Sequence, residues 1–154
     1  MADRLPETIR AIAFPTAGYL FALPMQAILK VIRTVPGTQQ SFDDVGLLSL
    51  GSEAIALLDL EARLGLATGA APARKPFAML ARAPGGNLYA IQIEDLPNML
   101  DLPAANIQPL PETARRSPLR RVARYAALWQ TPDQETLIFL LDLQLATQAL
   151  SRRT

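Results

Sequence analysis

The sequence contains no cysteine and no histidine among its 154 residues. Without cysteine the chain has no disulfides, no thiolate nucleophile and no cysteine-bound zinc, and without histidine it lacks the commonest proton shuttle and metal ligand. Aromatic residues are also scarce, at 6%. Much of the usual repertoire of active sites is therefore missing, and we expect a protein that is not an enzyme and has no catalytic residues, metal or cofactor.

Neither sign of charge is in excess, because 15 Lys and Arg residues are matched by 14 Asp and Glu residues, for a net charge of +1. Half of the residues are hydrophobic. This balance argues against intrinsic disorder and against long-range electrostatic steering. The length suffices for one domain with a substantial core, or for two small domains packed closely together.

One uncharged stretch, residues 11–29, approaches the roughly 20 residues of a membrane-spanning helix. Pro15, Gly18 and Pro24 interrupt it, which favours short strands over a helix. Residues 1–10 carry charges of both signs and no apolar run, so we expect no signal peptide. The expected location is the cytoplasm, without direct insertion into a membrane.

The sequence also repeats itself. Residues 18–23 (GYLFAL) return as 86–91 (GNLYAI), and residues 56–60 (ALLDL) return as 139–143 (FLLDL). The first pair is offset by 68 positions (20 to 88) and the second by 83 (59 to 142), so the second copy holds an insertion of about 15 residues, since 83 minus 68 is 15. We predict two copies of one small β unit, with a seam of the kind that binds partners.

Short apolar runs separated by proline and glycine predict an all-β fold. Residues 15–18 and 83–87 predict the turns of two hairpins, and residues 107–111, with alternate prolines, predict an extended passage. We expect one domain over residues 9–150, made of a first unit at 9–66, a linker at 67–76 and a second unit at 77–150. The runs that predict strands are residues 9–14, 19–23, 28–35, 47–50, 54–58, 77–82, 88–93, 96–102 and 137–141.

Each unit is expected to end in a helix. Asp59 and Asp142 each follow an apolar strand and precede good helix formers, which is the position of an N-cap residue. A general acid and base pair is the alternative for these carboxylates, but no nucleophile or metal ligand lies near either of them in the sequence. We predict a helix of one or two turns after Asp59 and a longer closing helix over residues 143–153.

Five collinear segments together resemble the CheW-like domain. The resemblance covers roughly residues 9–150 and implies two closely joined, SH3-like, five-stranded β-barrels with short helices and a C-terminal helix. It also implies a non-enzymatic signalling adaptor whose partners are a chemoreceptor-like, methyl-accepting protein and a CheA-type histidine kinase, with a response regulator as a further partner. The segments are residues 19–33 (YLFALPMQAILKVIR), 46–60 (GLLSLGSEAIALLDL), 88–100 (LYAIQIEDLPNML), 107–111 (IQPLP) and 136–143 (TLIFLLDL).

The resemblance assigns partner contacts to particular positions. Ile28 takes the apolar, partner-facing position of the third strand, and Gly46 opens the receptor-side hairpin, followed by Leu47. Lys30 stands where the family commonly has an acidic residue, and Gly51 where it commonly has arginine, so one contact changes sign and a bidentate contact is lost. A divergent adaptor, for example in phototaxis or twitching motility, explains these departures as well as a standard one. Ile28 and Leu47 also fit core positions.

Arginines are concentrated in residues 115–124, within the inserted part of the second unit. Three interpretations remain open for this segment: a solvated edge that prevents aggregation, a docking patch for an acidic protein, and a nucleic-acid-binding surface on a small β-barrel. The net charge of +1 and the scarcity of aromatics weigh against nucleic acid, which stays as the alternative function. Arg120, Arg121 and Arg124 are the candidate contact residues.

Overall fold

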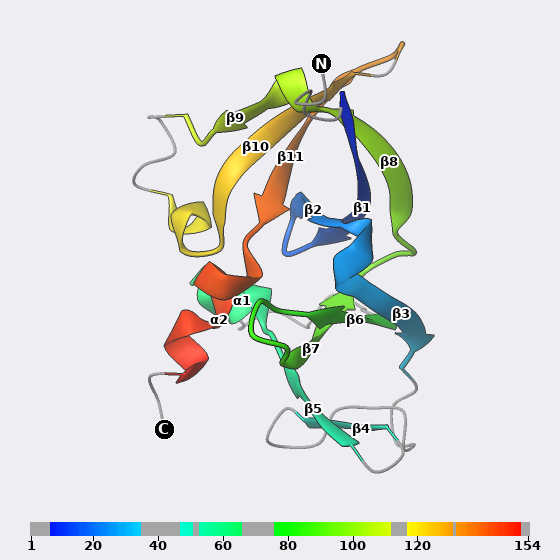
Figure 1. The fold of residues 1–154 in the computed structure, drawn as a ribbon, viewed down its shortest axis with the longest axis vertical. Helices are drawn as coiled ribbons and strands as arrows, with labels where there is room; N and C mark the ends of the chain where they lie inside the picture. The colour runs from blue at the N-terminus through cyan, green and yellow to red at the C-terminus, as the bar shows by residue number, and fades with distance from the viewer. Residues whose placement is uncertain are drawn as a thin grey trace, which may run out of the picture.

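The structure is a computed structural model that describes residues 7–34, 47–50, 53–65, 76–111, 117–130 and 132–151. The described residues form two β-sheets stacked along the long axis of the molecule, with short helices beside them (Figure 1). Each sheet curls into a barrel, and strands far outnumber helices. The predicted all-β class with two SH3-like barrels is confirmed.

The first sheet, which we call barrel A, has six strands in the order β8-β1-β2-β11-β10-β9. Its edge strands, β8 and β9, are separated along the chain only by the three-residue 3-10 turn η2 (Ala104–Asn106). This short link brings the two edges of the sheet together and adds a sixth strand to the five that we expected. The strands are β1 (Thr8–Thr16), β2 (Tyr19–Pro24), β8 (Asn98–Pro103), β9 (Ile107–Pro109), β10 (Ala123–Gln130) and β11 (Glu135–Leu141).

The second sheet, barrel B, has five strands in the order β3-β6-β7-β5-β4. A second 3-10 turn, η1 (Met25–Ala27), carries the chain from β2 of barrel A directly into β3 of barrel B. Pro24, at the end of β2, cannot donate a further ladder hydrogen bond, which favours the exit of the chain at this point. The strands are β3 (Ile28–Arg33), β4 (Leu47–Leu50), β5 (Glu53–Leu57), β6 (Phe77–Arg82) and β7 (Leu88–Ile93).

The two barrels exchange hairpins. We predicted units of contiguous sequence, 9–66 and 77–150, but the β1–β2 hairpin completes barrel A with β8 to β11, and the β6–β7 hairpin completes barrel B with β3 to β5. The parallel pairs β2–β11 and β5–β7 join the two sequence copies. The two sequence copies therefore correspond to similar sets of strands, but the first hairpin of each copy belongs to the barrel formed mainly by the other copy. The predicted linker lies outside the described residues, except for Pro76.

Two short helices follow β5 and β11, as the sequence predicts. They are α1 (Leu60–Arg63) and α2 (Leu143–Ser151). Asp59 accepts a hydrogen bond from the backbone N of Ala62 at 3.2 Å, and Asp142 accepts one from Leu145 N at 2.9 Å, so both predicted N-caps are confirmed. Within the described residues, no helix combines the length and the apolar character that crossing a membrane requires.

Three apolar clusters fill the described part of the molecule. The largest contains residues of both sheets and lies between the barrels, while smaller clusters fill the interiors of barrel A and barrel B. Side chains that alternate between the two faces of a strand contribute to two different clusters. On β2, Phe21 and Leu23 belong to the cluster between the barrels, whereas Ala22 belongs to the cluster inside barrel A. The contact between the barrels is thus part of the core.

Candidate functional site

An exposed apolar patch marks the start of β3, an edge strand whose pairing partner among the described strands is β6. The register shifts between Ile28, opposite Ala81, and Lys30, opposite Leu80, so Leu29 is the extra residue of a β-bulge. Leu29 is 46% exposed, and Met25 in η1 is 42% exposed. We call Met25, Leu29 and Lys30 the η1–β3 patch.

The bulge explains where the two predicted residues of this strand lie. Ile28 is half-buried and packs against the cluster between the barrels, so it belongs partly to the core. Lys30 is exposed beside Leu29. Sequence reasoning missed Leu29. Strict alternation in ILKVIR would have placed the charged Lys30 on the same face as the apolar Ile28 and Ile32. This conflict was the signal for a bulge.

The predicted receptor-side hairpin corresponds to β4 and β5. Leu47, the first residue of β4, pairs with Ala56, which confirms the strand pairing and leaves the proposed contact role of Leu47 as a prediction. Gly46 and Gly51 both lie outside the described residues. The strand β4 forms the edge of barrel B opposite to β3 in the order of the sheet.

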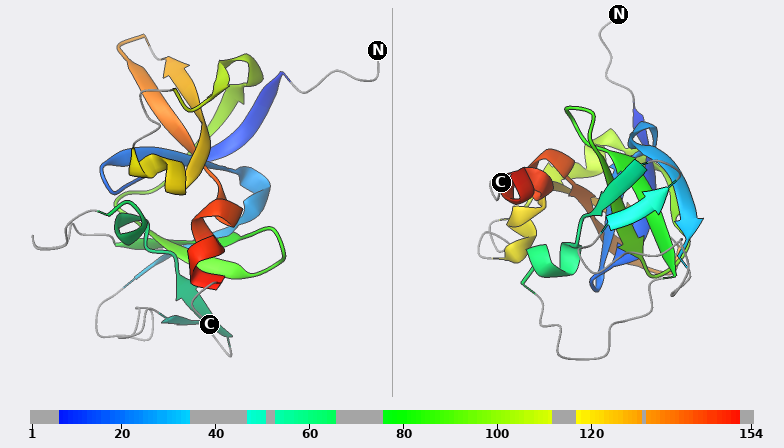
Figure 2. Two further views of the ribbon diagram at one scale, coloured as in Figure 1. Left: turned by 90° about the vertical axis from the view of Figure 1, so that its left-hand side faces the viewer. Right: turned by 90° about the horizontal axis from the view of Figure 1, so that it is seen from below.

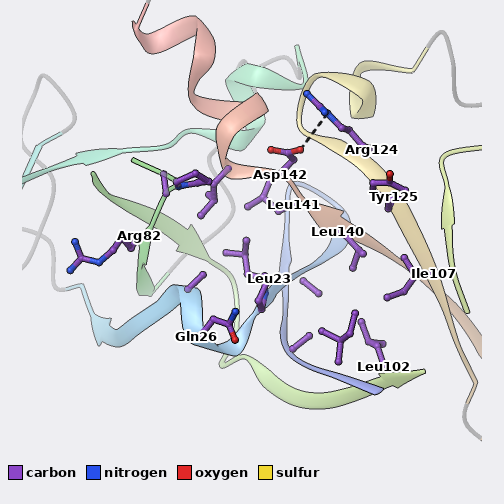
Figure 3. A pocket seen from close by; sticks show the side chains of 18 residues that line it. Leu23, Gln26, Arg82, Leu102, Ile107, Arg124, Tyr125, Leu140, Leu141 and Asp142 are labelled. Carbon is purple, nitrogen blue, oxygen red and sulfur yellow. Dashed lines mark ion pairs between the residues drawn. The ribbon is translucent and has the colours of Figure 1, made fainter. Parts of the chain in front are cut away.

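A largely apolar cavity of about 540 Å³ opens beside η1 (Figure 3). All six strands of barrel A contribute to its wall, and η1 contributes Gln26 and Ala27. The end of β6 and the turn that follows add Arg82 and Pro84, so barrel B closes part of the opening. The wall from barrel A consists mainly of Ile9, Ala11, Ala22, Leu102, Ile107, Tyr125 and Leu140.

The arginine segment includes the 3-10 turn η4 (Pro118–Arg121) and the start of β10. Arg121 donates a hydrogen bond from Nη1 to the carbonyl O of Arg63 at 3.4 Å, and Arg124 forms an ion pair with Asp142, with Nε and Oδ2 3.4 Å apart. These contacts tie the segment to α1 and to the start of α2. Arg120 is exposed in η4, and residues 115–116 lie outside the described residues.

The structure does not gather the predicted contact residues on one surface. Figure 1 shows η4, in yellow, on the side of the molecule opposite to β3, and Figure 2 shows η4 beside α1 and α2. The residues around Ile28 and the three candidate arginines are therefore two separate surfaces. The η1–β3 patch is the more apolar of the two and adjoins the cavity.

The sequence pattern of one known family, the CheW-like domain, matches residues 10–150. The chain belongs to the CheW-like domain family. The solved structures that resemble this CheW-like chain include that of the scaffolding protein TtCheW from Thermoanaerobacter tengcongensis, with a TM-score of 0.67 and 16% sequence identity, over 92% of this chain and 93% of that chain. At this identity the likeness shows the shared fold. No curated protein matches the sequence.

Membership of the CheW-like family supports a scaffold or adaptor role in chemotaxis-type signalling. This fits the observed surfaces, because an exposed edge strand and an apolar opening are features that bind other proteins. Within the described residues, no cluster of three or more acidic side chains has the geometry of a metal site.

Proposed function

We propose that this CheW-like domain is a non-enzymatic adaptor that couples chemoreceptor-like proteins to a CheA-type histidine kinase in the cytoplasm. The observation that carries the proposal is the family match over residues 10–150. A response regulator is a further partner of the same pathway. The pathway is chemotaxis or a related one, such as phototaxis or twitching motility. A standard adaptor and a divergent one explain the departures at Lys30 and Gly51 equally well.

The η1–β3 patch is the proposed docking surface. An edge strand offers backbone groups to an extended partner segment, which adds a strand to the sheet, while exposed side chains select the partner. Leu29 and Met25 offer apolar area, and Lys30 favours an acidic residue on the partner. Such contacts are individually weak, and assembly into an array would multiply them through avidity.

The first experiment compares Leu29→Asp with Leu137→Asp in capture of the tagged full-length chain from its native cell extract, with nuclease present and moderate salt. Leu137 is the matched control for Leu29, because both are strand residues of similar exposure. Leu29 is 46% exposed on barrel B, and Leu137 is 41% exposed on barrel A. Leu29→Asp should reduce recovery of a histidine kinase or receptor about tenfold or more, the loss of a binding hot spot. Leu137→Asp should capture normally.

Leu29 is a cleaner test position than Ile28. Because Ile28 is half-buried against the core, Ile28→Glu is expected to lower both capture and stability. Equal capture by Leu29→Asp and the wild-type chain would contradict the proposed docking surface. Recovery of no kinase, receptor or response regulator by the wild-type chain would contradict the adaptor function itself.

Nucleic-acid binding through Arg120, Arg121 and Arg124 is the alternative function. The contacts of Arg121 with Arg63 and of Arg124 with Asp142 support a structural role for these two arginines instead. A nucleic-acid binder should lose affinity steeply with salt. Nucleic acid that co-purifies when nuclease is omitted, with a steep salt dependence, would favour this alternative over the adaptor.

A further inference from the structure

Exposed apolar side chains are concentrated in two short segments of the chain. Among the described residues, eight large apolar side chains are exposed, and four of them lie within residues 25–29 and 96–99. Leu96 and Met99 are the most exposed of the eight, at 57% and 56%, and the other two are Met25 and Leu29 of the η1–β3 patch. Exposed apolar residues that cluster in this way, unlike single ones, mark a surface that binds another protein.

The two segments lie on the same side of the molecule. Figure 1 shows β8, which begins within the second segment, above β3 on the right-hand side of the view. Met99 on β8 is the register partner of Ile12 on β1, and Ile12 packs against the cluster between the barrels, as Ile28 does at the start of β3. Both segments therefore border the same seam. We define the β3–β8 face by the residues Met25, Leu29, Lys30, Asp95, Leu96 and Met99.

The charges beside the two segments are opposite in sign. Lys30 follows Leu29 on β3, whereas Asp95 precedes Leu96 in the loop that leads into β8. Both charged residues are exposed, and neither forms an ion pair with another described residue. The backbone N of Leu96 donates to Asp95 Oδ1 at 2.8 Å, which holds the carboxylate beside the exposed leucine. Each apolar segment thus has one charge next to it that the described chain leaves unpaired.

A face of this kind is complementary to a second copy of itself. Under a two-fold axis, residue i of one copy contacts residue j of the other, and j contacts i, so a pairing of Asp95 with Lys30 occurs twice. Because both segments lie on one side of the molecule, such a contact closes into a dimer. Segments on opposite sides would instead give an open chain of copies.

We propose that the chain forms a symmetric homodimer through the β3–β8 face, with the 96–99 segment of each copy packed against the 25–29 segment of the other. Asp95 of each copy pairs with Lys30 of the other. Apolar contact supplies the affinity, and the two ion pairs fix the orientation. Because Leu29 and Lys30 also belong to the proposed docking surface, the dimer is a form in which that surface is covered. Dimerisation is measured on the isolated chain, so its outcome is separate from that of the adaptor function.

The test is sedimentation equilibrium of the purified full-length chain at concentrations from about 10 µM to about 1 mM, the range of weak protein association. We expect a monomer–dimer equilibrium with no larger species, and weaker association when salt screens the ion pairs. Met99→Asp should weaken dimerisation about tenfold or more. Leu128→Asp, at an exposed strand residue of β10 outside the face, is the control and should dimerise normally.

Exchange of the charges tests the two-fold pairing itself. Asp95→Lys and Lys30→Glu each place like charges opposite one another in both symmetric contacts, so each variant alone should dimerise about tenfold more weakly. An equimolar mixture of the two variants should form a heterodimer with nearly wild-type affinity, because every charge at positions 30 and 95 then faces one of opposite sign. Asp133→Lys, at an exposed position between β10 and β11, is the control. If Asp95→Lys does not fold, Asp95→Asn removes the charge and retains an acceptor for Leu96 N.

A chain that stays monomeric up to about 1 mM overturns the proposal, as does normal dimerisation of Met99→Asp. Species larger than a dimer that disappear in Met99→Asp would indicate an open, head-to-tail contact and would overturn the two-fold symmetry. If the mixture of charge variants associates no better than either variant alone, Asp95 does not face Lys30 and the assigned pairing is wrong. A monomeric chain that still captures a kinase or receptor would reject the dimer and leave the adaptor function standing.

Discussion

Thr16 joins the two barrels through a polar contact within an apolar seam. Its side chain is 1% exposed, and its hydroxyl donates to the carbonyl O of Gln92 in β7 at 3.1 Å. Close by, the backbone N of Glu94 donates to the carbonyl O of Pro15 at 3.2 Å. Apolar packing has no preferred direction, whereas hydrogen bonds require a particular distance and angle. These two hydrogen bonds are therefore suited to fix the position of β1 relative to β7.

We predict that Thr16→Val destabilises the protein by about 1–3 kcal/mol, the cost of leaving a buried acceptor without its donor. Valine has nearly the same shape as threonine, so the change isolates the hydrogen bond. The free energy of unfolding in urea measures the effect, and Thr16→Ser, which keeps the hydroxyl, is the control and should lose less. A Thr16→Val protein as stable as the wild type would show that the contact adds nothing to stability.

At the residue scale, sequence reasoning identified β3 and Lys30 of the η1–β3 patch but not the exposed Leu29. The choice between core and interface for Ile28 depends on how far β3 turns away from the cluster between the barrels, and no local pattern encodes that. The bulge placed Lys30 beside Leu29 among the exposed residues, whereas strict alternation would have put Lys30 on the face of Ile28. Bulges arise from pairing with a neighbouring strand, here β6, which comes much later in the chain.

At the scale of secondary-structure elements, α2 depends on its first residues. Asp142 combines two roles, because its Oδ1 caps the helix at Leu145 N and its Oδ2 pairs with Arg124. The backbone N of Asp142 also donates to the carbonyl O of Val122 at 2.8 Å, which ties the start of α2 to the turn after η4. One carboxylate therefore connects α2 with β10.

We predict that Asp142→Ala lowers the free energy of unfolding by about 1 kcal/mol through the lost N-cap, plus a smaller contribution from the ion pair. Asp142→Asn keeps an acceptor for the cap and should retain most of the stability. Arg124→Gln removes only the ion pair, whose arginine side chain is 59% exposed, and should cost well under 1 kcal/mol.

Urea unfolding followed by far-UV circular dichroism distinguishes these variants. If Arg124→Gln were as destabilising as Asp142→Ala, the ion pair and not the cap would dominate. If Asp142→Asn were as destabilising as Asp142→Ala, the role assigned to the cap would be wrong.

Elements with a local signal were predicted well. The hairpins β1–β2 and β6–β7 have turn residues between apolar runs, and the caps at Asp59 and Asp142 have the required residue type in the required place. The strand β10 was the main element not assigned, because the arginines before it suggested a loop or edge. Its pairing with β11 determines its conformation, and that pairing depends on partners in the sheet more than on composition.

At the scale of the whole molecule, the sequence revealed two copies of one unit but not the exchange between them. The second strands of the two hairpins have similar sequences, GYLFAL at residues 18–23 and GNLYAI at residues 86–91, so this pattern does not distinguish which barrel each hairpin completes. The three-residue turn η1 decides the outcome by directing the chain out of barrel A and into barrel B. Topology of this kind depends on long-range pairing, such as β2 with β11, which leaves no local trace in the sequence.

The exchange predicts that the halves of the chain depend on each other. In a fragment of residues 1–70, the β1–β2 hairpin lacks β8 and β11, and in a fragment of residues 71–154, the β6–β7 hairpin lacks β3 and β5. Each fragment would also leave its share of the cluster between the barrels exposed to water. We therefore expect neither fragment to unfold cooperatively when it is alone.

Mixing or co-expressing the two fragments should restore a one-to-one complex with the circular dichroism and Trp129 emission of the intact chain, because every strand then regains its partners. In the intact chain, both signals should change at the same urea concentration, since the core between the barrels couples them. Cooperative unfolding of one isolated fragment would contradict this account. It would mean that a single sequence copy can pair its own hairpin with its own strands, as contiguous units would, and that the exchange is not needed to form a barrel.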